Sequence, residues 1–207
     1  MVFTGIVEGT GIISKIARKE NLSTITVDTP FNFNKGIQVG ASVCVDGVCL
    51  TVTKINQDSL EFDLIIETLK VTTFGSIKEK TIVNLERSMK LGDEIGGHMI
   101  SGHVFDTATI TKISEPENNY ILTLNIVPNL QKYVFSKGYI SLNGISLTIG
   151  EVNKIANTFT VYIIPETLRL TNLINKLVGD SINIEIETQT RNTVDTILEI
   201  NKESIHG

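Results

Sequence analysis

One stretch of this sequence occurs twice, and this repetition limits the possible folds more than any other feature. Residues 46–53 read DGVCLTVT and residues 143–150 read NGISLTIG, so that Gly144 follows Gly47 by 97 positions. Both copies place Gly, an apolar residue, Cys or Ser, Leu and Thr in the same order. Such a duplication predicts two similar folded units of about 100 residues each.

Each copy combines a turn signal with a strand pattern. Asp-Gly and Asn-Gly favour type I′ hairpin turns, in which both central residues need a positive φ. In the strand that follows, alternation places Leu50 and Val52 on one face and Cys49 and Thr51 on the other. The second copy has Ser146 where the first has Cys49. We expect the apolar face to point into a core and the thiol and hydroxyls to point outward.

These outward residues have two interpretations. Ser and Thr are common on the wet face of a strand, and Cys is often only a small hydrophobic residue. The other interpretation is a pair of related functional sites. The matching positions of Cys49 and Ser146, each followed two residues later by Thr, favour it.

Composition excludes several classes of protein. The chain has 207 residues, 41% of them hydrophobic and 20% charged, with no apolar run long enough to span a membrane. It carries no leader-like N-terminus, which predicts a cytoplasmic location. A net charge of −5 without a basic stripe argues against nucleic acid. Cys44 and Cys49 are expected to be free thiols, and His98, His103 and His206 lack the acidic neighbours of a metal site.

Short β-branched segments, separated by Gly, Asn and Asp, predict a mainly β fold. We expect two tandem closed barrels of about six strands, Greek-key-like in topology, because closure removes exposed sheet edges. The expected division is an N-terminal barrel at 1–97, with a linker at 87–97, and a C-terminal barrel at 98–187. A short helical turn is expected around 67–69, ending at Gly75, and two residues are inserted in the second copy near 154–157.

From Thr190 onward, the spacing of the apolar residues changes from that of a strand to that of a helix. Val194, Ile197, Leu198 and Ile205 form a helical stripe, with Thr188 or Thr190 as a candidate cap. We therefore expect a C-terminal oligomerisation helix at 188–207. Its stripe is expected to pack against a neighbouring subunit, with packing on its own barrel as the alternative.

Seven motifs together resemble one enzyme family. They are FTGIV at 3–7, GVCLTVT at 47–53, NLER at 84–87, IGGHMISGHV at 95–104, KG at 137–138, NGISLT at 143–148 and IPETL at 164–168. Each motif is weak alone, but their order and constant offset make the sequence similar to riboflavin synthases of the alpha-chain type, which carry a lumazine-binding domain repeat.

The resemblance implies a transferase that dismutates two molecules of 6,7-dimethyl-8-ribityllumazine. One molecule gives a four-carbon unit to the other, forming riboflavin and 5-amino-6-(D-ribitylamino)uracil. It also implies a homotrimer with active sites between barrels of neighbouring subunits, no cofactor, and lumazine synthase as a further partner. The duplication then has a chemical reason, because holding two rings in register can lower the barrier by roughly 7–11 kcal/mol.

The resemblance assigns four catalytic residues, namely Cys49, His103, Ser146 and Glu187. His103 is the candidate for proton transfer, because the usual pKa of histidine lies near 6.5. The alternative is a structural histidine in a turn. The family has Asp where this chain has Glu187, and a displacement near 1 Å can cost as much as ~10²-fold in rate. The family usually starts Met-Phe, whereas Val2 is inserted here before Phe3.

The resemblance also assigns two substrate pockets. The first comprises Gly5, Ile6, Val7, Cys49, Leu50, Thr51, Asp63, Leu64, Ile65, Ile66, Glu67 and Thr68. The second comprises Gly102, His103, Val104, Lys137, Ser146, Leu147, Thr148, Ile163, Ile164, Pro165, Glu166, Thr167 and Leu168. Backbone amides and Thr hydroxyls are expected to do much of the binding. Glu67 and Glu166 could alternatively only cap short helices.

Two other classes remain as alternatives. A lumazine protein of the same superfamily would bind the chromophore as an optical antenna without turning it over. A flavin-reductase-like barrel would use a nicotinamide cofactor, but would not be expected to have the repeat or the paired Cys and Ser positions.

Overall fold

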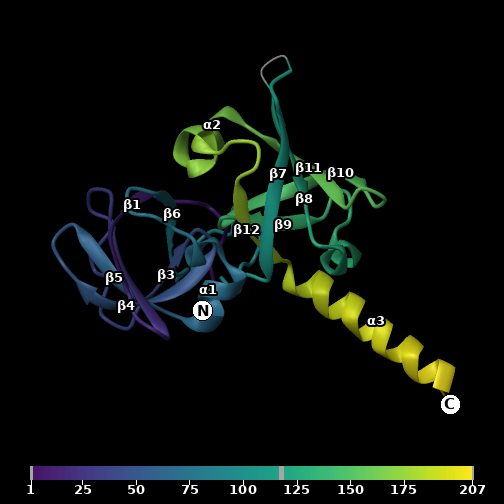
Figure 1. Ribbon diagram of the computed structural model, residues 1–207, viewed down its shortest axis with the longest axis horizontal. Helices are drawn as coiled ribbons and strands as arrows, with labels where there is room; N and C mark the ends of the chain where they lie inside the picture. Colours follow the sequence, from purple (N-terminus) through teal and green to yellow (C-terminus); the bar gives the residue numbers. More distant parts are fainter. Residues whose placement is uncertain (1, 117–118, 207) are drawn as a thin grey trace.

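The computed structural model describes residues 2–116 and 119–206. It has two lobes, each a closed antiparallel barrel of six strands, and a helix that extends away from them (Figure 1). This architecture confirms the predicted mainly β fold with two tandem barrels and a C-terminal helix.

The first barrel closes in the order β1-β2-β5-β4-β3-β6. Its strands are β1 (Gly9–Arg18), β2 (Leu22–Asp28), β3 (Ser42–Val45), β4 (Val48–Ile55), β5 (Ser59–Ile65) and β6 (Ile82–Arg87). Between β5 and β6 lie α1 (Ile66–Val71) and a 3₁₀ turn, η1 (Thr73–Gly75). The short helical segment ending at Gly75 is therefore present, as predicted.

The second barrel repeats this topology, with the ring order β10-β11-β8-β7-β12-β9. Its strands are β7 (Asp106–Ser114), β8 (Tyr120–Asn125), β9 (Tyr139–Leu142), β10 (Ile145–Asn153), β11 (Thr158–Ile163) and β12 (Ser181–Ile186). The short helical segments are η2 (Pro128–Tyr133), α2 (Pro165–Leu170) and η3 (Asn172–Asn175). The turn at 154–157, between β10 and β11, accounts for the change of repeat offset.

The repeated stretch folds as its sequence predicts. Asp46 and Gly47 have φ values of 45° and 81°, and Asn143 and Gly144 have values of 47° and 79°, as both turns require. Along β4, Leu50 and the other apolar residues that alternate with it are buried in the barrel core, whereas the threonines between them are exposed. The hairpin fixes the register, and the register in turn decides which side chains leave the core.

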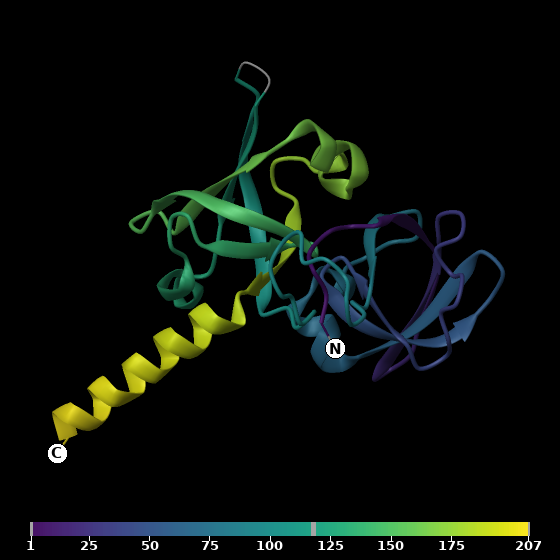
Figure 2. The same ribbon diagram turned by 180° about the vertical axis from the view of Figure 1, so that it is seen from behind.

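Equivalent residues of the two repeats meet where the barrels join. Phe3 and Ile100, 97 positions apart, form a bridge in which each amide donates to the other's carbonyl, at 2.8 and 2.9 Å. Both side chains are buried together with Cys44 in a small core between the barrels. These reciprocal contacts give the two barrels an approximate two-fold relation. Figure 2 shows the N-terminal segment running to this junction.

The terminal helix α3 (Thr188–His206) begins directly after β12. Thr188 is its first residue rather than its cap, and Thr190 lies in the first turn, where its hydroxyl donates to the Glu187 carboxylate at 2.5 Å. Tyr133 donates to Asp195 at 2.6 Å and ties the first half of α3 to the second barrel. The remainder of the helix projects from the lobes (Figure 1). Among the described helices, none has the length and apolar character needed to cross a membrane.

Candidate functional site: two crossed contacts between the barrels

A segment of the first repeat lies against the predicted catalytic strand of the second. The Ser146 amide donates to the Gly5 carbonyl at 2.9 Å. Gly5 has a φ of +75°, and a Cβ on it would meet the Ser146 Cβ at 2.5 Å. Only glycine satisfies both this backbone conformation and this close approach.

The reverse contact joins the second repeat to the first. The Cys49 amide donates to the Gly102 carbonyl at 2.8 Å. Gly102 has a φ of +76°, and a Cβ on it would meet the Cys49 Cβ at 2.5 Å. Ser146 and Cys49 are thus covered in the same way, each by a glycine loop of the other barrel. We call these the Ser146 contact and the Cys49 contact.

A buried carboxylate holds each glycine loop. Glu86 on β6 accepts from the Thr4 amide at 2.6 Å, from the Thr4 hydroxyl at 2.8 Å and from the Gly5 amide at 3.1 Å. Glu185 on β12 makes the same three bonds to Ser101 and Gly102, at 2.7, 2.7 and 2.8 Å. Burial raises the pKa of both carboxyl groups, although these hydrogen bonds oppose the change. The carboxylates connect each loop rigidly to the last strand of its own barrel.

An imidazole completes the Ser146 contact. His98 Nδ1 lies 2.6 Å from Ser146 Oγ, and the ring stacks on Tyr139 with centroids 5.3 Å apart. His98 is only 6% exposed, and burial lowers its pKa below the usual 6.5, against the opposing charge of Glu187. The imidazole is therefore neutral near pH 7. A neutral imidazole hydrogen-bonded to a hydroxyl can pass a proton through it.

The Cys49 contact has different chemistry. Cys49 is half-buried, and burial raises the pKa of its thiol, with a hydrogen bond from Ser42 opposing the shift. Across the hairpin it faces Cys44, and burial raises the pKa of that thiol well above its usual value. Both cysteines are free thiols and remain protonated near neutral pH. Cys49 can thus fill space or donate weakly, but it is a poor nucleophile in this environment.

The serine pair of the second barrel matches the cysteine pair of the first. Ser141 faces Ser146 across β9 and β10, as Cys44 faces Cys49 across β3 and β4. Ser141 is 1% exposed, and in the described part of the chain its hydroxyl finds no hydrogen-bond partner.

Two further cavities lie beside the glycine loops, at equivalent positions of the repeats. One, of about 320 Å³, is lined by Met99, Ser101 and Glu187 among others. The other, of about 460 Å³, is lined by Thr4 and Ser88 among others. Glu187 and Ser88 occupy equivalent positions after the last strands of their barrels. The two pockets therefore lie at related places in the repeats but differ in volume and lining, because the second also includes charged residues such as Glu8 and Arg87.

The predicted substrate-binding residues divide between surface and core. Exposed members include Ile6, Thr51, Asp63, Ile65, Ile66, Glu67, His103, Lys137, Thr148, Ile164, Pro165 and Glu166, whereas Leu50, Leu64, Leu147 and Ile163 are buried in the barrel cores. Val7 packs against the second barrel's core, and Val104 packs against the first's. Thr68, Thr167 and Leu168 are partly buried in α1 and α2. Glu166 pairs with Arg169 at 2.6 Å on the surface.

The predicted catalytic residues fall in two places. Ser146 lies with His98, whose pKa responds to the charge of Glu187. His103 follows Gly102 on the side of Cys49, and its charge lowers the pKa of Glu185. The imidazole bonded to Ser146 thus belongs to His98 rather than to His103.

Sequence reasoning missed His98 and the two buried carboxylates. His98 lies in the IGGHMISGHV motif, but its repeat equivalent is Met1, which lies outside the described residues, so the duplication gives no signal for it. Glu86 and Glu185 do recur at a constant offset in the NLER and NIEI segments, which could have identified them. No group of three His, Cys, Asp or Glu suited to a metal ion occurs within residues 2–116 and 119–206.

Comparisons with known proteins agree with this duplicated architecture. The lumazine binding domain family matches the chain twice, at residues 4–88 and 101–187. Riboflavin synthase of Escherichia coli (strain K12) is 46% identical, with 95% of this chain and 92% of the relative covered. Riboflavin synthases of Buchnera aphidicola subsp. Schizaphis graminum and Chlamydia pneumoniae are 43% and 42% identical, with coverage of 99% and 96% of this chain and 98% and 96% of the relatives.

Solved structures of similar fold carry related ligands. LumP complexed with 6,7-dimethyl-8-(1'-D-ribityl) lumazine matches with a TM-score of 0.81 at 27% identity, covering 90% of this chain and 99% of LumP. LumP complexed with riboflavin matches with a TM-score of 0.82 at 28% identity, covering 90% and 100%. With two lumazine-binding domains and full-length relatives above 40% identity, the chain belongs to the riboflavin synthase family.

Proposed function

We propose that this protein is a riboflavin synthase, which converts two molecules of 6,7-dimethyl-8-ribityllumazine into riboflavin and 5-amino-6-(D-ribitylamino)uracil. The observation that best supports this proposal is the pair of crossed contacts, in which the two repeats have the same backbone arrangement but different side chains. The reaction uses one substrate in two roles, donor and acceptor. Two related but unequal pockets suit such a reaction.

We assign proton transfer first to the Ser146 contact. The reaction requires removal of a proton from the 7-methyl group of one lumazine, whose ring accepts the resulting negative charge. His98, neutral near pH 7 and 2.6 Å from the Ser146 hydroxyl, can take up a proton through that hydroxyl. Glu187 favours the resulting imidazolium through its charge. His103, exposed near the Cys49 contact, stays a candidate for proton transfer at the other pocket.

We assign substrate binding to the two pockets predicted from the sequence. Most of their exposed members lie where β4 and β5 of the first barrel, and β10 and β11 of the second, meet α1 and α2, whereas Ile6, His103 and Lys137 lie in loops. Thr51 and Thr148 occupy equivalent exposed positions on β4 and β10 and can donate to ring or ribityl oxygens. The buried members Leu64 and Ile163 shape the barrel wall and can contribute only main-chain groups at its edge.

We further propose a homotrimer in which each active site forms between the N-terminal barrel of one subunit and the C-terminal barrel of the next. Val194, at the start of the predicted stripe, packs on the second barrel of its own chain. Farther along α3, however, Ile197, Leu198 and Ile200 are 53%, 39% and 56% exposed, which supports packing against another subunit. The side chain of Ile205 lies outside the described residues.

The domain division at 1–97, 98–187 and 188–207 remains a proposal. The cytoplasmic location and the association with lumazine synthase are proposals as well.

A lumazine-binding antenna protein is the second candidate, favoured by the similarity to LumP structures that hold lumazine and riboflavin. The identity to LumP is 27–28%, well below the 46% to a riboflavin synthase. The His98–Ser146 pair also supplies proton-transfer chemistry that an antenna does not need.

Incubation of the purified protein with 6,7-dimethyl-8-ribityllumazine alone tests the proposal, with riboflavin followed by its absorbance. We expect riboflavin to form without any added cofactor, and the rate to fall at least about 10²-fold in Ser146→Ala and in His103→Ala. Ser14→Ala, on the outer face of β1, is the matched control and should keep the parent rate. Tight lumazine binding without riboflavin would instead establish the antenna function.

A further inference from the structure

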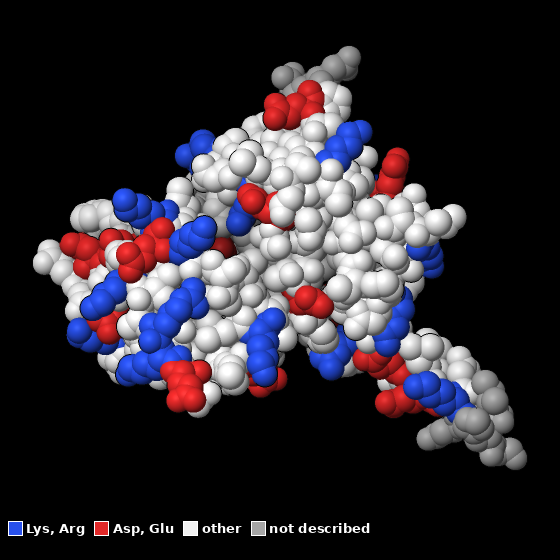
Figure 3. Space-filling view, viewed as in Figure 1, with Lys and Arg blue, Asp and Glu red and all other residues white. Residues whose placement is uncertain are grey.

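The two barrels also enclose a cleft away from both crossed contacts. It has a volume of about 530 Å³, and its walls are the same segment of each repeat, residues 73–82 and residues 172–181. None of the residues that form the Ser146 or Cys49 contacts lines it. Figure 3 shows a hollow between the lobes with basic and acidic side chains at its edge. Its size falls in the range of small-molecule sites.

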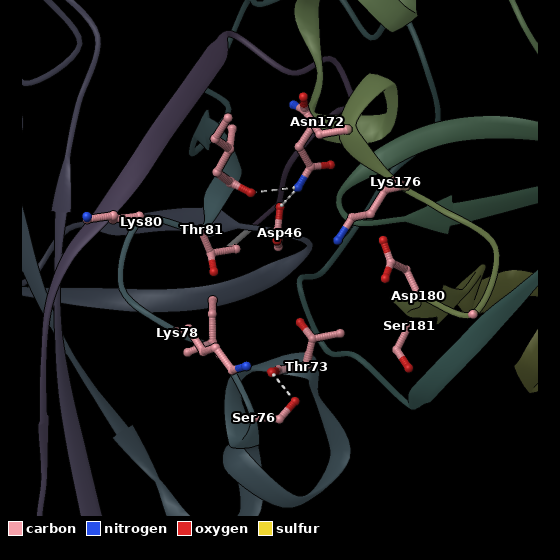
Figure 4. Close-up of a pocket in the computed structure, with 14 residues that line it drawn as sticks. Asp46, Thr73, Ser76, Lys78, Lys80, Thr81, Asn172, Lys176, Asp180 and Ser181 are labelled. Atoms are coloured by element: carbon pink, nitrogen blue, oxygen red, sulfur yellow. Dashed lines mark hydrogen bonds between the residues drawn. The ribbon is translucent and has the colours of Figure 1, made fainter.

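Hydrogen-bonded polar groups form the floor of the cleft. Asp46 accepts from the Asn84 amide at 2.7 Å and from the Asn172 side chain at 2.9 Å, which links the two barrels. The Asn172 side chain also donates to the Ile82 carbonyl at 3.1 Å, and Figure 4 shows the two bonds of this side chain. Burial raises the pKa of Asp46 to about 7, while the nearby Lys176 charge opposes this. The floor is therefore partly uncharged near neutral pH.

The cleft is lined by three lysines and two carboxylates, Asp46 and Asp180. Lys78, Lys80 and Lys176 line the cleft, and in the described part of the chain none of them forms an ion pair. Lys176 projects between Asp46 and Asp180, whereas Lys80 extends away from the floor (Figure 4). Lys78 and Lys176 therefore offer ammonium groups from opposite barrels.

The remaining wall groups are short and uncharged. Thr73, Ser76, Thr81 and Ser181 contribute hydroxyls, and Asn175 contributes an amide. Ser76 bonds weakly to the Thr73 carbonyl, at 3.4 Å, and can exchange that bond for a ligand. Groups of this kind suit the hydroxyls of a polyol, and a lysine acts as a point charge toward phosphate.

We propose that this cleft binds a small phosphorylated polyol, with the phosphate between Lys78 and Lys176 and the polyol hydroxyls along the Ser and Thr side chains. A protein partner fits less well, because a pocket of about 530 Å³ between two barrels admits a small molecule. The site is independent of the reaction at the crossed contacts.

Isothermal titration calorimetry of the full-length protein tests this inference at constant ionic strength. The probes are ribose 5-phosphate, inorganic phosphate and ribose. We expect saturable binding of one ribose 5-phosphate per chain, weaker binding of phosphate, and none of ribose. Lys176→Gln and Lys78→Gln should each weaken the binding of ribose 5-phosphate about tenfold or more, without changing the rate of riboflavin formation.

Lys154→Gln, in the exposed turn between β10 and β11, is the matched control and should bind as the parent does. If Lys154→Gln weakened the binding of ribose 5-phosphate as much as Lys78→Gln and Lys176→Gln do, the lysines would act only by general charge attraction. That result would overturn the proposed site. Equal affinity for phosphate and ribose 5-phosphate would overturn the polyol assignment. Saturable binding of neither probe would overturn the whole inference.

Discussion

At the scale of single residues, the protein is best understood from the positions where its two repeats differ. Asp46 stands where the second repeat has Asn143, Cys49 where it has Ser146, and Ser88 where it has Glu187. The hairpins around the first two positions share one backbone frame, so these differences change charge or acidity within it, whereas Glu187 leads into α3 and Ser88 leads into a loop. We expect the differences at Cys49 and Ser146, and at Ser88 and Glu187, to make the two candidate pockets unequal, whereas Asp46 lies in the separate cleft between the barrels.

The first prediction concerns Asp46 and pH. Its pKa is raised from 3.8 to about 7 in the folded protein, so the folded state binds a proton more tightly than the unfolded state. Its contribution to stability is present below about pH 4 and is lost as the pH rises toward 7, by up to about 1.4 kcal/mol per pH unit. Asp46→Asn should remove this fall, because Asn143 already fills the equivalent turn position.

Urea unfolding of the parent and of Asp46→Asn between pH 4 and 8 measures the effect. Asp58→Asn, at an exposed loop position, is the control and should follow the parent. A variant that loses stability with the same pH slope as the parent would contradict the assignment.

The second prediction concerns His98 and the pH dependence of the rate. Burial lowers its pKa below 6.5, so the neutral imidazole persists to lower pH than in an exposed histidine. The acid limb of the kcat profile should therefore lie below pH 6.5. His98→Asn should lower kcat by about 10²-fold or more.

Glu187→Gln provides a separate check on the same group. The Glu187 charge raises the pKa of His98, so its removal should move the acid limb to still lower pH. An acid limb that stays in place in Glu187→Gln and in His98→Asn would mean that another group titrates.

At the scale of elements, the glycine loops and the carboxylates that hold them set the geometry of the two crossed contacts. The loop at Gly5 reaches the second barrel and the loop at Gly102 reaches the first, each bonded to its own last strand by Glu86 or Glu185. Strand β10 places the Ser146 hydroxyl, the Gly5 loop of the other repeat covers the strand at this position, and His98 bonds to the hydroxyl. Each loop and strand therefore forms from nearby residues of the sequence, whereas the crossed contacts form between these elements.

The third prediction tests this close approach through Gly5→Ala. A Cβ there would lie 2.5 Å from the Ser146 Cβ, so the loop and β10 must separate. A displacement near 1 Å can cost as much as ~10²-fold in rate, and we expect a loss of riboflavin formation approaching that size. Rates and urea unfolding should be measured together.

Gly36→Ala is the matched control for this prediction. Gly36 has nearly the same φ, +76°, but a Cβ added to it would have no other atom within 4 Å. The Gly36→Ala variant should lose only about 1–2 kcal/mol of folding stability, from the strained backbone, and should form riboflavin at the parent rate. A similar rate loss in both variants would show that backbone strain, and not the contact with Ser146, is responsible.

At the scale of the whole molecule, the protein is an approximately two-fold pair of barrels with a projecting helix. Its junction combines the Phe3–Ile100 bridge with buried amides such as Asn84, which donates to the Asn143 carbonyl at 3.0 Å. The free half of α3 exposes apolar side chains that neither barrel of the chain covers. This arrangement favours association with further copies of the chain.

The fourth prediction is that the parent sediments as a trimer and that α3 is needed for it. Replacing Ile197 and Leu198 together by Asp places charges on the exposed stripe and should shift the protein toward the monomer. Analytical ultracentrifugation gives the mass, and Asn201→Asp, an exposed change on the same helix, is the control. A double variant that remains trimeric would place the interface elsewhere.

The repeat alone determined the barrels, because alternation and turn chemistry are local properties of the chain. The Asp46-Gly47 and Asn143-Gly144 turns, the outward Thr51 and the core-facing Leu50 all follow from the period of two and from positive φ values. These patterns can be recognised in a single sequence because they involve residues that are close together in the chain.

Only the tertiary structure decided which residues share a site. His98 reaches Ser146 across 48 positions, and Gly5 reaches it across a whole barrel. No local pattern encodes such contacts, because the first depends on how the second repeat folds back on itself and the second on how the two barrels pack against each other. The burial that lowers the pKa of His98, and that raises the pKa of Asp46 to about 7, arises from the same packing.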